Sequence, residues 1–295
     1  MRNRIPLIPI AAFILGACGD TTPKTPDANA AEVTTASPVT PSAATPTTPI
    51  VPEPASFEDA QSAFREKHYD EAVRLFTAYA AEQPENVWGY YMLGLSAWKA
   101  GDSDGAAVAF QLALGKDSTH VKSRINLSRV LLEQGKAQEA LPHVEAALRR
   151  DSTSGVGYRL LGRVRAELGD PTGAIQAFQR AIVLDGRDLW SMNNLARVYI
   201  GQARFEEALG PLARAIEIDS TVASFHNNLG ITLEHTGHPA QAADAYRAAL
   251  ALDSTHQKAS VNLNRVETLK QDPSVVPVDL GGLARSFVEQ VQTWR

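Results

Sequence analysis

Small and apolar residues recur along this chain with a period of 34 residues. One alanine recurs six times without an insertion, at Ala72, Ala106, Ala140, Ala174, Ala208 and Ala242. A glycine keeps the same spacing, with Ala203 in its one gap, at Gly101, Gly135, Gly169 and Gly237. Repetition at this period indicates a stack of copies of one small structural unit.

Each period predicts two helices separated by a turn. In residues 223–256, apolar or small residues recur every three or four positions on both sides of a Thr-Gly-His-Pro turn. That spacing places them on one face of each helix. Gly230 and Ala242 are small enough to let the two helices approach closely, and Tyr246 is expected to fill the space beside them.

The residues at these places resemble those of the tetratricopeptide repeat. Leu-Gly pairs stand in the first helix of three copies, at Leu93-Gly94, Leu161-Gly162 and Leu229-Gly230. An aromatic residue stands in the second helix of four copies, at Phe76, Phe110, Phe178 and Tyr246. The family's terminal proline is present as Pro84, whereas four later copies carry Asp-Ser-Thr, in which Ser and Thr are expected to cap the next helix.

The resemblance implies an all-α fold. We expect a right-handed α-solenoid of about six helix-turn-helix repeats, followed by a capping helix and a C-terminal amphipathic helix. The solenoid covers 53–271, with a cap at 257–271 after copies at 53–86, 87–120, 121–154, 155–188, 189–222 and 223–256.

The last part of the chain leaves this register. Residues 272–279 contain two prolines and are expected to form a linker. Residues 280–295 carry apolar side chains every three or four positions, which predicts the amphipathic helix. Two interpretations are open: the helix packs on the last repeat and seals it, or it occupies the groove or binds a partner.

The N-terminus resembles a bacterial lipoprotein signal peptide. Arg2 and Arg4 precede an apolar run over 5–15, which is shorter than the roughly 20 residues that span a bilayer. Small residues then lead to Cys18, the only cysteine. The resemblance implies removal of residues 1–17 and lipid attachment at Cys18. A buried strand and an ordinary secretory signal are the alternatives.

These features predict a location in the bacterial cell envelope. Residues 18–52 are rich in threonine, proline and alanine, which predicts a disordered tether between lipid and repeats. The outer membrane, facing the periplasm, is favoured over the inner membrane. The formal net charge of −5 and this location argue against a nucleic-acid partner.

The first helix of each repeat supplies the candidate binding residues. In this family, residues two, five, six and nine places into a repeat face the concave groove. Amides stand at the fifth place as Asn193 and Asn227, and at the sixth as Asn126, Asn194, Asn228 and Asn262. Arginines stand at the ninth place as Arg129, Arg163, Arg197 and Arg265.

These side chains have the chemistry of a peptide-binding groove. An amide both donates to and accepts from a peptide backbone, and a guanidinium matches a carboxylate. A similar asparagine ladder lines the repeats of the O-linked N-acetylglucosamine transferase family, where the resemblance implies peptide binding. The alternative is a set of solvated polar residues, with each arginine paired to a neighbouring glutamate.

An apolar anchor is expected at the N-terminal end of the groove. Trp88, Tyr91 and Leu95 stand in one first helix, and tryptophan and tyrosine are typical of binding hot spots. With the arginines further along, the groove would be apolar at one end and cationic at the other.

The sequence predicts binding rather than catalysis. It has no phosphate-binding loop or nucleophile elbow, and the His235-x-x-His238 pair straddles a turn without further ligands, so we expect neither metal nor cofactor. The function expected is a membrane-anchored scaffold or adaptor that binds peptide segments of envelope proteins. The alternatives are a pilotin-like lipoprotein for a pilus or secretin, and a peptidoglycan- or glycan-binding module.

Overall fold

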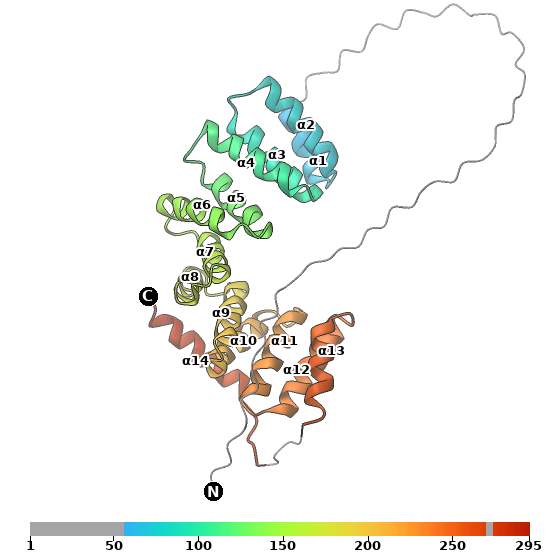
Figure 1. The fold of residues 1–295 in the computed structure, drawn as a ribbon, viewed down its shortest axis with the longest axis vertical. Coiled ribbons are helices and arrows are strands. Elements are labelled where there is room, and N and C mark those ends of the chain that lie inside the picture. Colours follow the sequence, from blue (N-terminus) through green and yellow to red (C-terminus); the bar gives the residue numbers. More distant parts are fainter. Residues whose placement is uncertain (1–55, 270–273) are drawn as a thin grey trace, which may run out of the picture. The chain divides into compact units, whose positions relative to one another are not determined.

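The computed structural model describes residues 56–269 and 274–295. They form an all-α fold of stacked helix pairs, as predicted (Figure 1). The predicted signal peptide, Cys18 and the tether lie outside the described residues. In the part of the chain that is described, no helix is both long and apolar enough to cross a membrane.

Fourteen helices follow one another in the described residues. Their bounds are α1 Phe57–Arg65, α2 Tyr69–Glu82, α3 Val87–Ala100, α4 Ser103–Lys116, α5 Val121–Glu133, α6 Ala137–Arg150, α7 Gly155–Glu167, α8 Pro171–Leu184, α9 Leu189–Gly201, α10 Phe205–Ile218, α11 Ala223–His235, α12 Pro239–Leu252, α13 Gln257–Val266 and α14 Leu280–Gln292.

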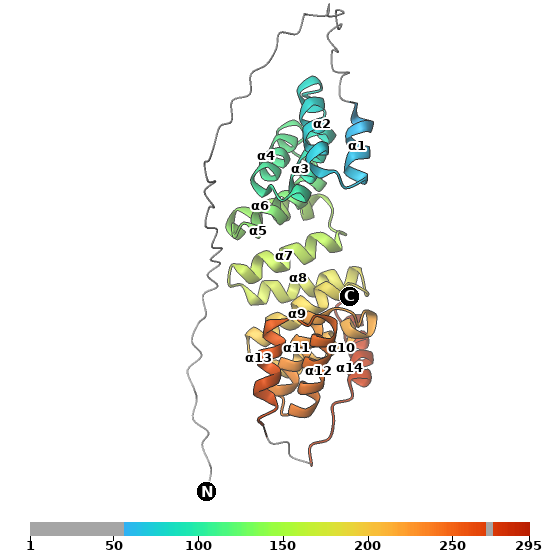
Figure 2. The same cartoon turned by 90° about the vertical axis from the view of Figure 1, so that its right-hand side faces the viewer.

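The first thirteen helices form a stack in which each helix packs on its neighbour in sequence. The first helices of successive repeats also contact one another from α1 through α13. Figure 2 shows the pairs following one another in chain order. The odd-numbered helices therefore form one layer, and their exposed faces share a surface.

The recurring glycine ends the first helix of the repeat. Gly101, Gly135, Gly169 and Gly237 all have positive φ, between 73° and 90°. Ala203 takes the same conformation at φ 57°. Glycine reaches this region without strain because it has no Cβ, which explains why the sequence repeats it.

The turn that replaces proline works differently from the prediction. The Asp117 carboxylate accepts hydrogen bonds from the backbone N–H and the hydroxyl of Thr119, at 2.8 and 2.7 Å. The same pair of bonds recurs at Asp151, Asp219 and Asp253. Aspartate thus holds the turn, and the expectation that Ser and Thr cap the next helix is wrong.

Close packing within a repeat follows the predicted small-to-aromatic contact. The recurring alanines from Ala72 to Ala242 are fully buried. A Cβ added to Gly162 would lie 2.6 Å from the Phe178 ring, and Gly230 faces the Tyr246 ring in the same way. The repeat therefore needs glycine at this position so that the aromatic ring can lie against the first helix.

Helix α14 lies on the second-helix side of the stack. It packs against α10 and, more lightly, α8 (Figures 1 and 2). Phe287 and Val291 are buried there, and Gly210 on α10 leaves room for Phe287. The chain leading to α14 is fixed by Gln241, whose amide exchanges hydrogen bonds of 2.7 and 3.1 Å with the Val278 backbone.

This placement corrects two expectations for the last helix, and binding of a partner by this helix stays a prediction. It does not seal the last repeat, because α10 belongs to the fifth copy and α8 to the fourth. It does not occupy the groove either, because its helix contacts are with second helices. The apolar positions of 280–295 predicted a buried face but did not identify the helices that bury it.

Candidate functional site

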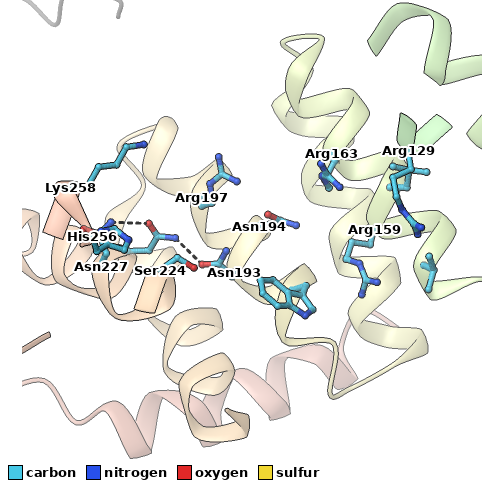
Figure 3. Close-up of a pocket in the computed structure, with 14 residues that line it drawn as sticks. Arg129, Arg159, Arg163, Asn193, Asn194, Arg197, Ser224, Asn227, His256 and Lys258 are labelled. Carbon is cyan, nitrogen blue, oxygen red and sulfur yellow. Dashed lines mark hydrogen bonds between the residues drawn. The ribbon is translucent and has the colours of Figure 1, made fainter. Parts of the chain in front are cut away.

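The first helices from α5 to α13 line a cavity of about 560 Å³ (Figure 3). All its lining residues except His256 stand at the second, fifth, sixth or ninth place of a repeat. They are Arg129, Val156, Arg159, Leu160, Arg163, Trp190, Asn193, Asn194, Arg197, Ser224, Asn227, Asn228, His256 and Lys258. We call this surface the inner groove.

The inner groove is strongly cationic. Four arginines and a lysine line it, and none of the described residues that line it carries a carboxylate. Arg159 is neutralised by the buried Asp188 carboxylate at 2.6 Å. In contrast, Arg163 and Arg197 are exposed and make no ion pair or hydrogen bond within the described ranges. These two guanidinium groups remain available to an anion.

Arg129 lies in a positive environment. Its guanidinium donates to the Asn126 amide oxygen at 2.8 Å and lies 5.2 Å from the centre of the Trp98 ring. Burial lowers the pKa of Arg129, Glu133 raises it, and Arg159 and Arg163 lower it further. The arginines of α5 and α7 therefore repel one another across the groove.

A second cavity continues the inner groove toward the C-terminal ends of α5, α7 and α9. Its volume is about 810 Å³, and Arg163, Asn194 and Arg197 line both cavities. Glu133 and Glu167 also line it, so the negative charge begins where the first cavity ends. Arg163 and Arg197 thus occupy the middle of one continuous surface.

Most of the asparagine ladder is hydrogen-bonded to itself. Asn262 donates to Asn227 at 3.1 Å. Asn227 donates to Asn228 at 3.5 Å, and Asn228 to Asn193 at 2.8 Å (Figure 3). The buried Asn193 and Asn227 are therefore held in fixed orientations. Asn194 makes no side-chain hydrogen bond within the described residues and lies half-buried in the groove.

The outer members of the predicted ladder do not line the inner groove. Asn126 is buried and donates to the Tyr91 hydroxyl and to the Lys122 carbonyl. Asn262 is half-buried and is joined to Asn227. Their contacts connect neighbouring turns and helices, so packing accounts for both residues.

Arg265 is paired with a glutamate, as the alternative interpretation of the arginines expected. Its guanidinium holds the Glu234 carboxylate through two hydrogen bonds of 2.8 and 2.7 Å. The Tyr246 hydroxyl donates to the same carboxylate at 2.9 Å. Burial raises the pKa of Glu234, but the hydrogen bonds from Arg265 and Tyr246 outweigh this and leave the pKa below 4.5. Arg265 is a structural ion pair of the last helices.

The residues expected to form the apolar anchor belong largely to the hydrophobic core. Tyr91 is 9% exposed, and its ring packs against Trp88, Phe110 and His120. Leu95 is half-buried against the same core. Trp88 is 46% exposed, with the Lys122 ammonium 5.0 Å from its ring centre. None of the predicted anchor residues lines the inner groove described above.

Trp190 is one of several groove residues that the sequence interpretation did not include; the others are Val156, Arg159, Leu160, Ser224, His256 and Lys258. Trp190 is 50% exposed in the cavity, and its ring packs edge-on against the buried Phe225. Val156, also exposed, adds apolar surface on α7. Both stand at the second place of a repeat, as Trp88 does, so the register contained the signal, although it was used for apolar residues only in the repeat of Trp88.

Comparison with known proteins agrees with this architecture. The tetratricopeptide repeat profile matches residues 57–120, 125–188 and 193–256. Among solved structures, the crystal structure of YrrB, described as a TPR protein with an unusual peptide-binding site, is 23% identical, with a TM-score of 0.51. The match covers 63% of this chain and 96% of YrrB, and it shows the fold alone.

Two curated proteins of Pseudomonas aeruginosa are similar in sequence. The type IV pilus assembly protein PilF is 26% identical over 155 residues, which cover 52% of this chain and 61% of PilF. The TPR repeat-containing protein PA0015 is 32% identical over 71 residues, which cover 24% of this chain and 66% of that protein. The chain thus spans less than two thirds of either relative. Because the repeat profile covers more than half of its residues, the chain belongs to the tetratricopeptide repeat family.

Proposed function

We propose that this protein-binding scaffold captures an extended segment of a partner protein along the inner groove and holds it near a bacterial membrane. The observation that carries the proposal is the cavity itself, which is built from recurring first-helix positions of adjacent repeats. A surface repeated along a stack suits an extended occupant, because each repeat offers a similar set of contacts.

The groove chemistry supports a peptide occupant. Asn194 offers an amide that has no hydrogen-bond partner among the described residues and that can donate to and accept from a peptide backbone. Trp190 and Val156 offer exposed apolar surface beside it. Backbone pairing supplies affinity for any sequence, and an apolar side chain on Trp190 would add selectivity.

Site-specific photocrosslinking in cells tests the proposal. A photoreactive amino acid replaces Asn194 in the groove or, as a control, Val108, which is 55% exposed on α4. We expect a discrete crosslinked protein at Asn194 and none at Val108. No crosslink at Asn194, or the same products at both positions, would contradict groove capture.

The membrane part of the proposal rests on the basic, apolar and small residues before Cys18. A Cys18→Ser variant should move from the membrane fraction to the soluble fraction, because a lipid-anchored chain depends on that sulfur. Equal membrane association of the variant and the wild type would contradict the anchor and leave groove binding untouched.

A role in pilus assembly is the second candidate, favoured by the similarity to PilF. Deleting the gene in its own bacterium should abolish surface pili, and the wild-type gene should restore them. Normal piliation in the deletion strain would dismiss this candidate. The crosslinked partner at Asn194 would then point to another assembly.

A further inference from the structure

We infer that the segment held in the inner groove is acidic, with carboxylates placed on Arg163 and Arg197. This inference deepens the proposed function and rests on it. It names the chemistry of the partner segment: at least two Asp or Glu side chains, or one such side chain and a C-terminal carboxylate, beside an apolar residue that meets Trp190.

Charge in the groove is the first argument. Arg129, Arg163, Arg197 and Lys258 line it beside Arg159, which is paired with Asp188, and none of the described lining residues is a carboxylate, although the chain as a whole carries a net charge of −5. The groove is therefore positive in a protein that is otherwise acidic. Such a local field attracts a short acidic segment and repels a basic one.

The contacts available to each arginine are the second argument. Arg265 reaches the side chain 31 residues before it, Glu234, on the preceding first helix. The residue 31 before Arg163 is Leu132, and the one before Arg197 is Ala166. An arginine at this place is neutralised by an ion pair at α13, whereas Arg163 on α7 and Arg197 on α9 make no ion pair within the described residues, although Glu133 and Glu167 line the adjoining cavity.

The surroundings of these two arginines favour a peptide over a polynucleotide. Asn194 lines both cavities together with Arg163 and Arg197, so a backbone-reading amide accompanies the two cations (Figure 3). Glu133 and Glu167 limit the positive surface at one end. A long polyanion would meet these carboxylates and the acidic remainder of the protein, whereas a short segment would not.

A selection from a random twelve-residue phage-displayed peptide library tests the inference. The full-length wild-type chain is compared with the double variant Arg163→Gln and Arg197→Gln. The matched control is Arg74→Gln with Arg285→Gln, which removes the same charge from exposed sites on α2 and α14. Circular dichroism and thermal unfolding verify that all three proteins are folded.

We expect peptides selected by the wild type and the control to be enriched in Asp and Glu. Their affinity for the groove double variant should fall about tenfold or more, because charged hydrogen bonds are lost. Raising the ionic strength should weaken wild-type binding more than variant binding.

Four results would overturn the inference. Peptides selected without acidic enrichment, yet crosslinked at Asn194, would leave groove capture standing and remove its acidic character. Acidic peptides that bind the groove double variant and the wild type with equal affinity would show that their binding site lies elsewhere. Binding of a single-stranded oligonucleotide that exceeds peptide binding and is lost in the groove variant would assign the cations to nucleic acid. A selection that yields no groove binder would remove the proposed function as well.

Discussion

At the residue scale, one missing Cβ sets the distance between the two helices of a repeat. Gly162 is in contact with the Phe178 ring, and Gly94 with the Phe110 ring, so neither position has room for a methyl group. Gly115, near the end of α4, meets nothing within 4 Å. The two kinds of helical glycine should therefore respond oppositely to the same substitution.

Gly162→Ala should lower the free energy of unfolding by about 1–3 kcal/mol, because the added methyl group displaces the Phe178 ring. Gly115→Ala should raise it by up to about 1 kcal/mol, because alanine favours the helix and meets no neighbour. Urea denaturation of both variants measures these changes. Similar effects at the two positions would show that ring contact is not the reason for the glycine.

The Glu234 carboxylate should make the free energy of unfolding depend on pH in the acidic range. Its folded pKa lies below the ordinary value for glutamate, so its contribution is complete above the pKa of the unfolded chain and is lost as the pH falls through the folded pKa. Glu234→Gln should destabilise the protein by about 1–3 kcal/mol at neutral pH, through weaker bonds to Arg265 and Tyr246. The difference from wild type should shrink below about pH 4.

Denaturant unfolding between pH 3 and 7 measures this dependence. Glu58→Gln, at an exposed position on α1, is the control and should leave the pH profile unchanged. A Glu234→Gln deficit that stays constant down to pH 3 would show that the ionised carboxylate is not what stabilises the last helices.

The residue types predicted much of the candidate site, but the interaction partners of each side chain could be identified only in the structure. The register correctly placed Arg163, Asn194 and Arg197 on the inner faces of first helices. It could not separate them from Arg265, because that distinction depends on Glu234 in the preceding repeat. Tyr91 was misjudged for a similar reason, since aromatic residues serve cores and binding surfaces alike.

At the element scale, the repeats and the helix at 280–295 were predictable, but the packing of α14 was not. Periodicity identifies helices that contact their neighbours in sequence, which holds from α1 to α13. Helix α14 instead packs on α10 and α8. Periodicity does not indicate which distant helices a helix outside the repeats will contact. Gly210 was a local sign, because it replaces the larger side chains at this place in most other repeats and admits Phe287.

Phe287→Ala should detach α14. The side chain is 2% exposed, and its removal should cost about 3 kcal/mol or more of local stability. Hydrogen exchange should rise in 280–292 and on the facing side of α10, and remain unchanged in α1–α4. Val288→Ala, at a 39% exposed position on the same helix, is the control and should change exchange little. Unchanged protection in Phe287→Ala would contradict the docked position of α14.

At the scale of the whole molecule, the repeats depend mainly on their neighbours. One buried cluster contains Phe76 and Phe110, and another, further along the stack, contains Phe178 and Phe225. Contacts between helices beyond adjacent repeats are confined to α14 with α8 and α10. Stability should therefore be distributed along the stack and not concentrated in a single centre.

Substitutions at opposite ends of the stack should act separately. Phe76→Ala should increase hydrogen exchange in α1–α4 and leave α9–α13 near wild type, whereas Phe225→Ala should do the reverse. Mass spectrometry of peptic fragments would locate each effect. A uniform increase throughout the described helices in either variant would indicate one cooperative unit instead.

The return of α14 to α10 has a consequence for the order in which the protein is made. The outer face of α10, with Gly210 and Pro211, leaves the ribosome before α11, α12 and α13, and the helix that covers it is translated only after all three. During that interval this apolar surface of the nascent chain is exposed and prone to aggregation, because α14 is not yet present to bury it. Slow translation between 219 and 279 would lengthen the exposure, and a chaperone that shields this surface would shorten it.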